Sequence, residues 1–251
     1  MQAAGFVKGR PTALFVLDYG LFKVHSNGRV IGICGFLIQT DAGENILVDT
    51  GFPAKYARDT DAATEEDRLY EFGEVLACTP DHLPKAQLAK LGLTGEDLTL
   101  HICTHTHIDH IGGLADYPDV PILVSKTERD LAQPLYWGDV RPMEWPDQTY
   151  LIVEGDVAVG PGLKVLAAPG HAPGQIALMV DLPSGPVLLT SDAISRPAEI
   201  EERFAGSWDE AAALTSAKRI MAMAKDRDAF VIYGHCPEQW GTLKKAPEGY
   251  R

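Results

Sequence analysis

The sequence of 251 residues predicts a layered α/β sandwich formed by one domain, residues 1–251. Three observations predict it: strand patterns alternate with helical patterns, two pairs of strands form hairpins, and the length is typical of a single α/β core. With 45% hydrophobic and 23% charged residues, the composition is that of an ordinary globular chain.

Two predicted hairpins lie about 140 residues apart, an interval that can mark an internal repeat. The first joins 35–40 to 45–51 through a turn at 41–44, and the second joins 176–182 to 186–193 through a turn at 183–185. β-Branched and large apolar residues around a glycine-containing turn are typical of hairpins. Each second strand ends in an aspartate followed by a small residue, which hints at two related halves.

The other elements follow from apolar spacing and from start and stop signals. Helices are predicted at 64–77, 83–91, 126–132 and 209–225, the last of which is rich in alanine. Strands are predicted at 98–104, 120–125, 162–170 and 229–235.

Two segments, 134–150 and 194–208, fit neither pattern because they mix prolines, charges and aromatic residues. Their aromatic residues include Trp137, Trp145, Phe204 and Trp208. Two interpretations stay open: the rings anchor surface loops to the core, or they form walls of a substrate pocket.

Charge and composition exclude several partners. Twenty-two basic residues against thirty-five acidic ones give a net charge of −13, which repels nucleic acid. Apolar runs fall far short of the roughly 20 residues that span a membrane. Four scattered cysteines without a C-x-x-C pair, and no export signal, favour reduced thiols in the cytoplasm. The expected partner is therefore a small molecule.

Chemistry is concentrated in THTHIDHIGG, residues 104–113. His105 and His107 are two residues apart in an extended loop, so both can reach one metal ion. Asp109 and His110 come where the chain turns and can reach a second ion beside the first. Imidazole and carboxylate are ligands suited to zinc and similar divalent ions.

One loop cannot complete two coordination spheres, so distant residues must contribute. His171, Asp192 and His235 each follow a predicted strand, and strand ends at one edge of a sandwich converge. Without metal, so many polar groups packed together would be costly to bury. The sequence therefore predicts two divalent ions, with zinc favoured, bound by His105, His107, Asp109, His110, His171, Asp192 and His235. His101, inside a predicted strand, is interpreted as a core-edge or supporting group.

These motifs resemble the metallo-β-lactamase superfamily, whose H-x-H-x-D-H motif matches residues 105–110. Within it, the chain looks most like the N-acyl-homoserine lactonases. The matching stretches are ILVDTGFP (46–53), EGDVAVGPGLKVLAAPGHAPG (154–174), VLLTSDA (187–193), FAGSWD (204–209) and YGHCPEQ (233–239).

The resemblance implies a four-layer αββα sandwich with the site at one edge. It implies that one ion is held by His105, His107 and His171, and the other by Asp109, His110 and His235. Asp192 would bridge both ions, and Asp49 would support the site without being a ligand.

One position departs from this family. The lactonases generally carry a tyrosine three residues after the bridging aspartate, and this chain has Ser195 there. The next residue, Arg196, could pair with a substrate carboxylate. Ser195 and Arg196 therefore join the four aromatic residues as candidate substrate-binding residues.

The predicted activity is opening of a lactone by a metal-bridging hydroxide, which the resemblance links to quorum quenching. Metal binding lowers the pKa of water toward 7, and the second ion stabilises the leaving alkoxide. Asp192 would hold the two ions together, and Asp109, besides being a ligand, could relay a proton.

Three alternatives use the same fold or ligands. A thioester hydrolase of the glyoxalase II type would need basic residues such as Lys244, Lys245 and Arg251, but its motif usually begins Thr-His-His-His. A mononuclear iron oxygenase would use two histidines and one aspartate, and it would not need Asp109, His110 and His235 together. A non-catalytic metal-binding module is the third.

Overall fold

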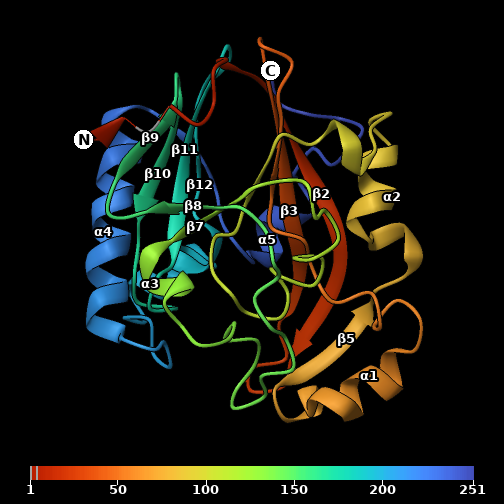
Figure 1. The fold of residues 1–251 in the computed structure, drawn as a ribbon. Helices are drawn as coiled ribbons and strands as arrows, with labels where there is room; N and C mark the ends of the chain where they lie inside the picture. Colours follow the sequence, from red (N-terminus) through yellow and green to blue (C-terminus); the bar gives the residue numbers. More distant parts are fainter. Residues whose placement is uncertain (1, 4) are drawn as a thin grey trace.

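The computed structural model describes residues 2–3 and 5–251, and it places two β-sheets face to face (Figure 1). The first sheet has seven strands in the order β5-β2-β3-β4-β6-β7-β8. They are β2 (Pro11–Val24), β3 (Val30–Thr40), β4 (Asn45–Val48), β5 (Gly73–Ala77), β6 (Leu100–Ile102), β7 (Ile122–Ser125) and β8 (Tyr150–Val153).

The second sheet has six strands in the order β1-β9-β10-β11-β12-β13. They are β1 (Gln2–Ala3), β9 (Val157–Gly160), β10 (Leu163–Ala167), β11 (Ile176–Leu182), β12 (Gly185–Leu189) and β13 (Phe230–Ile232).

Helices lie on the outer sides of the two sheets: α4 beside the second sheet, α1 and α2 beside the first (Figure 1). The helices are α1 (Thr60–Asp67), α2 (Pro84–Ala89), α3 (Lys126–Arg129), α4 (Glu210–Asp226) and α5 (Pro237–Trp240). Short 3₁₀ helices occupy Leu69–Glu71, Pro80–His82, Gly95–Asp97, Ser191–Ile194 and Pro197–Ile200. Within the described residues, no helix has the length and apolarity to cross a membrane. The predicted αββα sandwich is confirmed.

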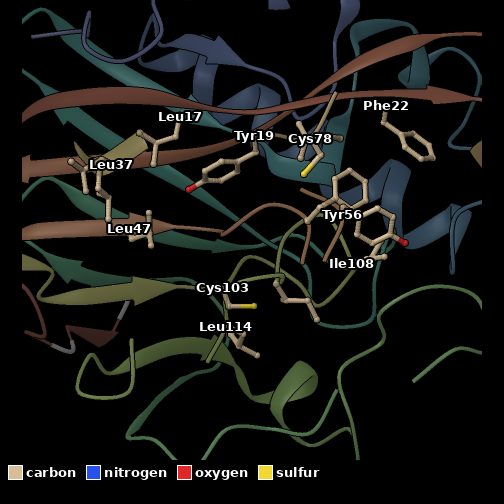
Figure 2. Packing of buried hydrophobic residues seen from close by; sticks show 14 of the residues in the cluster. Leu17, Tyr19, Phe22, Leu37, Leu47, Tyr56, Cys78, Cys103, Ile108 and Leu114 are labelled. Atoms are coloured by element: carbon tan, nitrogen blue, oxygen red, sulfur yellow. The ribbon is translucent and has the colours of Figure 1, made fainter. Parts of the chain in front are cut away.

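Three hydrophobic clusters hold these layers together. One lies between the sheets and includes Val16, Ile46 and Leu178. A second joins the first sheet to its outer helices, and Figure 2 shows Tyr19, Cys103 and Leu114 among its members. The third lies between the second sheet and α4 and includes Leu188, Phe204, Ala217 and Ile220.

Both predicted hairpins are confirmed, as β3–β4 and β11–β12. They also have matching surroundings. β4 pairs in parallel with β6, and β12 pairs in parallel with β13. The aspartates that follow β4 and β12, Asp49 and Asp192, therefore come from corresponding places in the two sheets.

The helix predicted at 64–77 is wrong beyond Asp67. Helix α1 ends at Asp67, and Arg68 adopts a left-handed conformation with φ of 54°. Gly73–Ala77 then forms β5, in which Val75 is buried between exposed neighbours. This alternation has a period of two, and β5 pairs with the end of β2. A sheet edge 50 residues away in the sequence therefore decides the structure of this segment.

Elsewhere the predicted helices and strands are found, with ends that differ by a few residues. The predicted strand at 186–193 stops at Leu189, and Ser191–Ile194 forms a 3₁₀ turn. The long strand β2 (Pro11–Val24) was not predicted, because only its pairing with β3 and β5 makes this segment continuous.

Candidate metal centre

The predicted ligand loop begins where β6 ends, and hydrogen bonds to the turn after β4 hold it in place. The Thr104 backbone N–H donates to Oδ1 of Asp49 at 2.8 Å, and its hydroxyl donates to Oδ2 at 2.7 Å. The N–H of Thr50 donates to the carbonyl of His110 at 2.8 Å. Asp49 has a φ of 57°, a left-handed conformation that aspartate tolerates. The D-T-G turn after β4 therefore fixes both ends of the loop.

Position 112, directly after the ligand loop, has no room for a side chain. A Cβ atom there would lie 2.0 Å from the backbone carbon of Phe52. The Gly112 N–H also donates to the carbonyl of Gly51 at 2.8 Å. The two turns are thus in direct backbone contact.

Three histidines form a first group of converging nitrogens. Nε2 of His105 lies 3.1 Å from Nδ1 of His107, which lies 2.8 Å from Nε2 of His171. Oδ2 of Asp192 lies 3.2 Å from Nε2 of His171 and 4.0 Å from Nε2 of His105. We call these three histidines the first ligand group.

A second group lies on the other side of Asp192. Oδ2 of Asp109 is 3.6 Å from Nε2 of His110 and 3.4 Å from Nε2 of His235. Oδ1 of Asp192 is 3.5 Å and 3.1 Å from the same two nitrogens. Asp109, His110 and His235 are the second ligand group. Asp192 presents one oxygen to each group.

The second group is oriented through the opposite ring nitrogens. Nδ1 of His110 lies 2.8 Å from Oδ2 of Asp49, and Nδ1 of His235 lies 2.9 Å from the carbonyl of Gly32. When these nitrogens carry the protons, both Nε2 lone pairs face Asp109 and Asp192. The ring orientations therefore suit cation binding.

Burial and neighbouring charges shift the pKa values in opposite directions in the two groups. Burial lowers the pKa of His107 to about 3, and burial with neighbouring histidines lowers that of His105. Burial also disfavours charged His110 and His235, but the aspartates around them outweigh it and raise both pKa values well above the usual range. The first group therefore offers neutral imidazoles, whereas the second lies in a negative field.

The donor atoms fit divalent cations. The ligand atoms of each cluster of three, such as His105, His107 and His171, lie within 4.8 Å of one another. Among the described residues, Nε2 of His110 and Oδ1 of Asp192 are buried without a hydrogen-bond partner. Converging lone pairs and unpaired buried polar atoms are costly unless a cation lies between them. The seven predicted residues are thus brought together in a form that could hold two ions.

The match to a known family agrees with this geometry. Residues 35–235 match the family model described as the metallo-beta-lactamase superfamily. The chain belongs to the metallo-β-lactamase superfamily.

Its relatives within the superfamily include lactonases. An N-acyl homoserine lactonase of Bacillus cereus is 34% identical over 222 residues, which cover 85% of this chain and 84% of the relative. The N-acyl homoserine lactonase AttM of Rhizobium radiobacter is 32% identical over 178 residues, 65% of this chain and 68% of the relative. A solved N-acyl homoserine lactone hydrolase, with the product N-hexanoyl-L-homoserine bound at its catalytic metal center, has a TM-score of 0.80 at 28% identity. That match covers 96% of this chain and all of the other.

In this superfamily member, the unusual segment at 195–196 lies directly beside the second ligand group. The carbonyl of Ser195 accepts a hydrogen bond from the His235 N–H at 2.9 Å. The Ser195 N–H donates to Oε2 of Glu199 at 2.7 Å. Arg196 forms an ion pair with Glu202, and its Nε is buried without a partner among the described residues.

The four candidate aromatic residues have different surroundings. Trp137 follows Tyr136, whose backbone forms an isolated β-bridge with His107. The ring of Trp137 packs on that of Phe72, with centroids 5.3 Å apart. Trp145 donates from its indole N–H to Leu131 and packs against Tyr150 and Arg129. Phe204 is 4% exposed within the cluster under α4, whereas Trp208 is 65% exposed. The burial of Phe204 favours the anchor interpretation for this residue. Trp137 is half-buried against the second hydrophobic cluster, next to the β-bridge between Tyr136 and His107.

Several supporting residues were not found by sequence reasoning. Glu128 is fully buried and binds the Thr106 side chain and backbone. Tyr136 accepts from the Ile108 N–H at 2.8 Å and donates its own N–H to Thr106 at 2.7 Å. A glutamate in a short helix and a tyrosine in an irregular loop carry no sequence signal of such roles. His101 is buried in β6 with Nε2 unpartnered in the described structure.

The basic residues considered for a thioester substrate lie over aromatic rings. Nζ of Lys244 is 5.6 Å from the ring centre of Tyr250, and Nζ of Lys245 is 4.1 Å from that of Trp240. Arg251 lies over the ring of Phe15. These contacts give the three charges a packing role at the carboxyl end of the chain.

Proposed function

We propose that this chain is a dinuclear metal-dependent hydrolase that opens lactones. The first ligand group would hold one divalent ion and the second another, and Asp192 would contribute one carboxylate oxygen to each. The observation that carries the proposal is the carboxylate of Asp192, with one oxygen toward each group. Relatives that match most of the chain are N-acyl homoserine lactonases, which supports a cyclic ester as the substrate.

The reaction adds water across an ester bond. The water oxygen bonds to the carbonyl carbon, the bond from that carbon to the ring oxygen breaks, and the ring oxygen leaves with a proton. Two divalent ions held by these seven residues would lower the pKa of a bound water and polarise the carbonyl. We propose that Asp109, whose side chain is 16% exposed, also passes a proton from the water to the leaving oxygen.

We propose that the substrate lies beside the second ligand group. Ser195 occupies the position at which the lactonases carry tyrosine, and its carbonyl binds His235. A serine leaves more space there than a phenol would. We propose that the substrate fills this space with a polar group of its own, beside Arg196. We also propose that Trp137, next to the β-bridge between Tyr136 and His107, forms part of the pocket wall.

Zinc is the metal we propose, because five imidazoles and two carboxylates match its ligand preferences. We also propose that residues 1–251 form one domain, since the central cluster draws on both sheets and both sheets supply ligands. Four buried free cysteines are compatible with the proposed location in the cytoplasm.

The test is metal analysis combined with a substrate panel. The purified protein should contain two divalent ions per chain and hydrolyse lactones faster than thioesters or β-lactams. Chelation should abolish hydrolysis, and zinc, cobalt or manganese should restore it. A single iron with oxygen consumed during turnover would identify an oxygenase instead, and preferred cleavage of thioesters would identify a thioester hydrolase.

A further inference from the structure

The two ligand groups are supported in different ways. In the second group, ring nitrogens of His110 and His235 hydrogen-bond to Asp49 and Gly32. In the first group, no protein hydrogen bond to the second ring nitrogen of His107 or His171 is found in the described residues. Nδ1 of His105 lies 3.3 Å from the Thr104 hydroxyl, so this ring has such a contact. Because ring contacts of this kind normally fix metal-binding histidines, the loops that carry His107 and His171 must be held by other means.

Glu128, at the third position of α3, contacts both loops that carry the first group. Its Oε2 accepts from the Thr106 N–H at 3.1 Å and from the Thr106 hydroxyl at 2.5 Å. Its Oε1 accepts from the Gly174 N–H at 2.9 Å. Thr106 lies between His105 and His107, and Gly174 lies three residues after His171. One buried carboxylate therefore joins Thr106 and Gly174, which are 68 residues apart in the sequence.

The backbone at Gly174 lies very close to the start of α3. A Cβ atom on Gly174 would lie 2.3 Å from the Ser125 hydroxyl and 2.6 Å from the Glu128 nitrogen. The Ser125 hydroxyl also caps α3 by accepting from the Glu128 N–H at 3.2 Å. Only glycine allows the loop after His171 to lie against the start of α3. The cap by Ser125 and the packing of Gly174 thus fix the backbone of Glu128, from which its carboxylate reaches both loops.

From this we infer that Glu128 is a positioning residue that sets the affinity of the first ligand group for its ion, and not that of the second. The inference rests on the dinuclear site proposed above. Both oxygens are needed, because they accept from donors on different loops. Glutamine keeps one acceptor and turns an NH₂ group toward the other donor, so one loop loses its hydrogen bond and faces a buried donor.

The experiment measures each ion separately. In a His235→Ala background only the first group remains intact, and in a His171→Ala background only the second does. Chelator-stripped protein of each background, with and without Glu128→Gln, is titrated with Co²⁺, and binding is followed by d–d absorption and equilibrium dialysis. We expect Glu128→Gln to weaken Co²⁺ binding about 10–100-fold in the His235→Ala background. In the His171→Ala background the change should stay within about twofold.

Two further variants protect the test against misfolding. Thr106→Val removes the hydroxyl bond to Glu128 but keeps the branched shape. Like Glu128→Gln, it should weaken Co²⁺ binding by the first ligand group. Glu96→Gln is the matched control: Glu96 is exposed, and its side chain makes no hydrogen bond or ion pair in the described structure. Equal weakening in both backgrounds, or none in either, overturns the inference. Failure of the unmutated chain to bind two ions would instead overturn the proposed function.

Discussion

The Oδ2 atom of Asp49 lies 2.8 Å from Nδ1 of His110, so a carboxylate that is not among the proposed ligands fixes the ring of one that is. The same oxygen accepts the Thr104 hydroxyl, and Oδ1 accepts the Thr104 N–H. Asp49 therefore couples the turn after β4 to the start and the end of the ligand loop.

This relationship predicts the effect of Asp49→Asn. The amide cannot accept all three contacts and does not favour a proton on Nδ1 of His110. We expect kcat/KM to fall about 10–100-fold, with weaker binding of the second ion. Asp147→Asn, the same change at an exposed aspartate, should have no effect. If both variants hydrolyse lactones at the wild-type rate, Asp49 does not support the site.

Asp192→Ala should affect both ions, because each ligand group loses one oxygen contact. We expect kcat/KM to fall about a thousandfold or more, which is on the order of 4 kcal/mol of transition-state stabilisation. His105→Ala should cause a loss of the same order through the first ion. Metal content, measured alongside the kinetics, should fall in both. A variant that keeps two tightly bound ions and full activity would contradict the bridging role.

Ser195→Tyr and Arg196→Ala test which substrate the site accepts. A phenol donating to developing oxygen charge can contribute roughly 2.7–4 kcal/mol. We expect the tyrosine nevertheless to slow hydrolysis of carboxylated or aromatic lactones, because it fills the space that their polar group needs. Arg196→Ala should raise KM for carboxylated lactones and leave simple acyl-homoserine lactones unchanged. The idea fails if Arg196→Ala changes nothing while Ser195→Tyr speeds every substrate.

Phe204 and Trp137 should respond differently to truncation. Phe204 is buried in the cluster under α4, so Phe204→Ala should lower the free energy of unfolding by about 3–5 kcal/mol. Trp137 lies beside the residue that bridges to His107, so Trp137→Ala should mainly raise KM. Trp208→Ala, at an exposed position, serves as the comparison. Denaturant unfolding and steady-state kinetics on all three would reveal a reversed pattern.

His101 should make stability depend on pH. Burial lowers its pKa from 6.5 to about 4, so the folded chain keeps it neutral where the unfolded chain takes up a proton. The unfolded state binds more protons between these values, and stability therefore falls as pH falls from about 6.5 to 4. The loss reaches about 3 kcal/mol.

His101→Leu should remove this part of the pH dependence. Unfolding of metal-free wild type and variant by denaturant at pH 7, 6, 5 and 4 gives the difference directly. His25→Leu, at an exposed turn, is the control. A wild-type minus variant difference that stays constant across this range would show that His101 is not held neutral.

The sequence by itself predicted the parts of this protein that depend on local pattern. Hairpins around 41–44 and 183–185 follow from turn residues between apolar strands, and α4 follows from alanine content and helical spacing. The seven candidate ligands were predicted because the motif at 105–110 is dense in ligand types and because strand ends converge. Their division into two groups came from the resemblance to a family, and the structure brings the same atoms together.

Only the tertiary structure decided the features that depend on distant partners. Residues 73–77 read locally as helix, yet they form β5 because the edge of β2 offers its unpaired backbone groups. Glu128 looks like any glutamate in a short helix until folding brings Gly174 and Thr106 to its two oxygens. Hydrogen bonds between residues far apart in sequence leave no periodicity in the chain. Their existence is fixed only when packing has placed both partners.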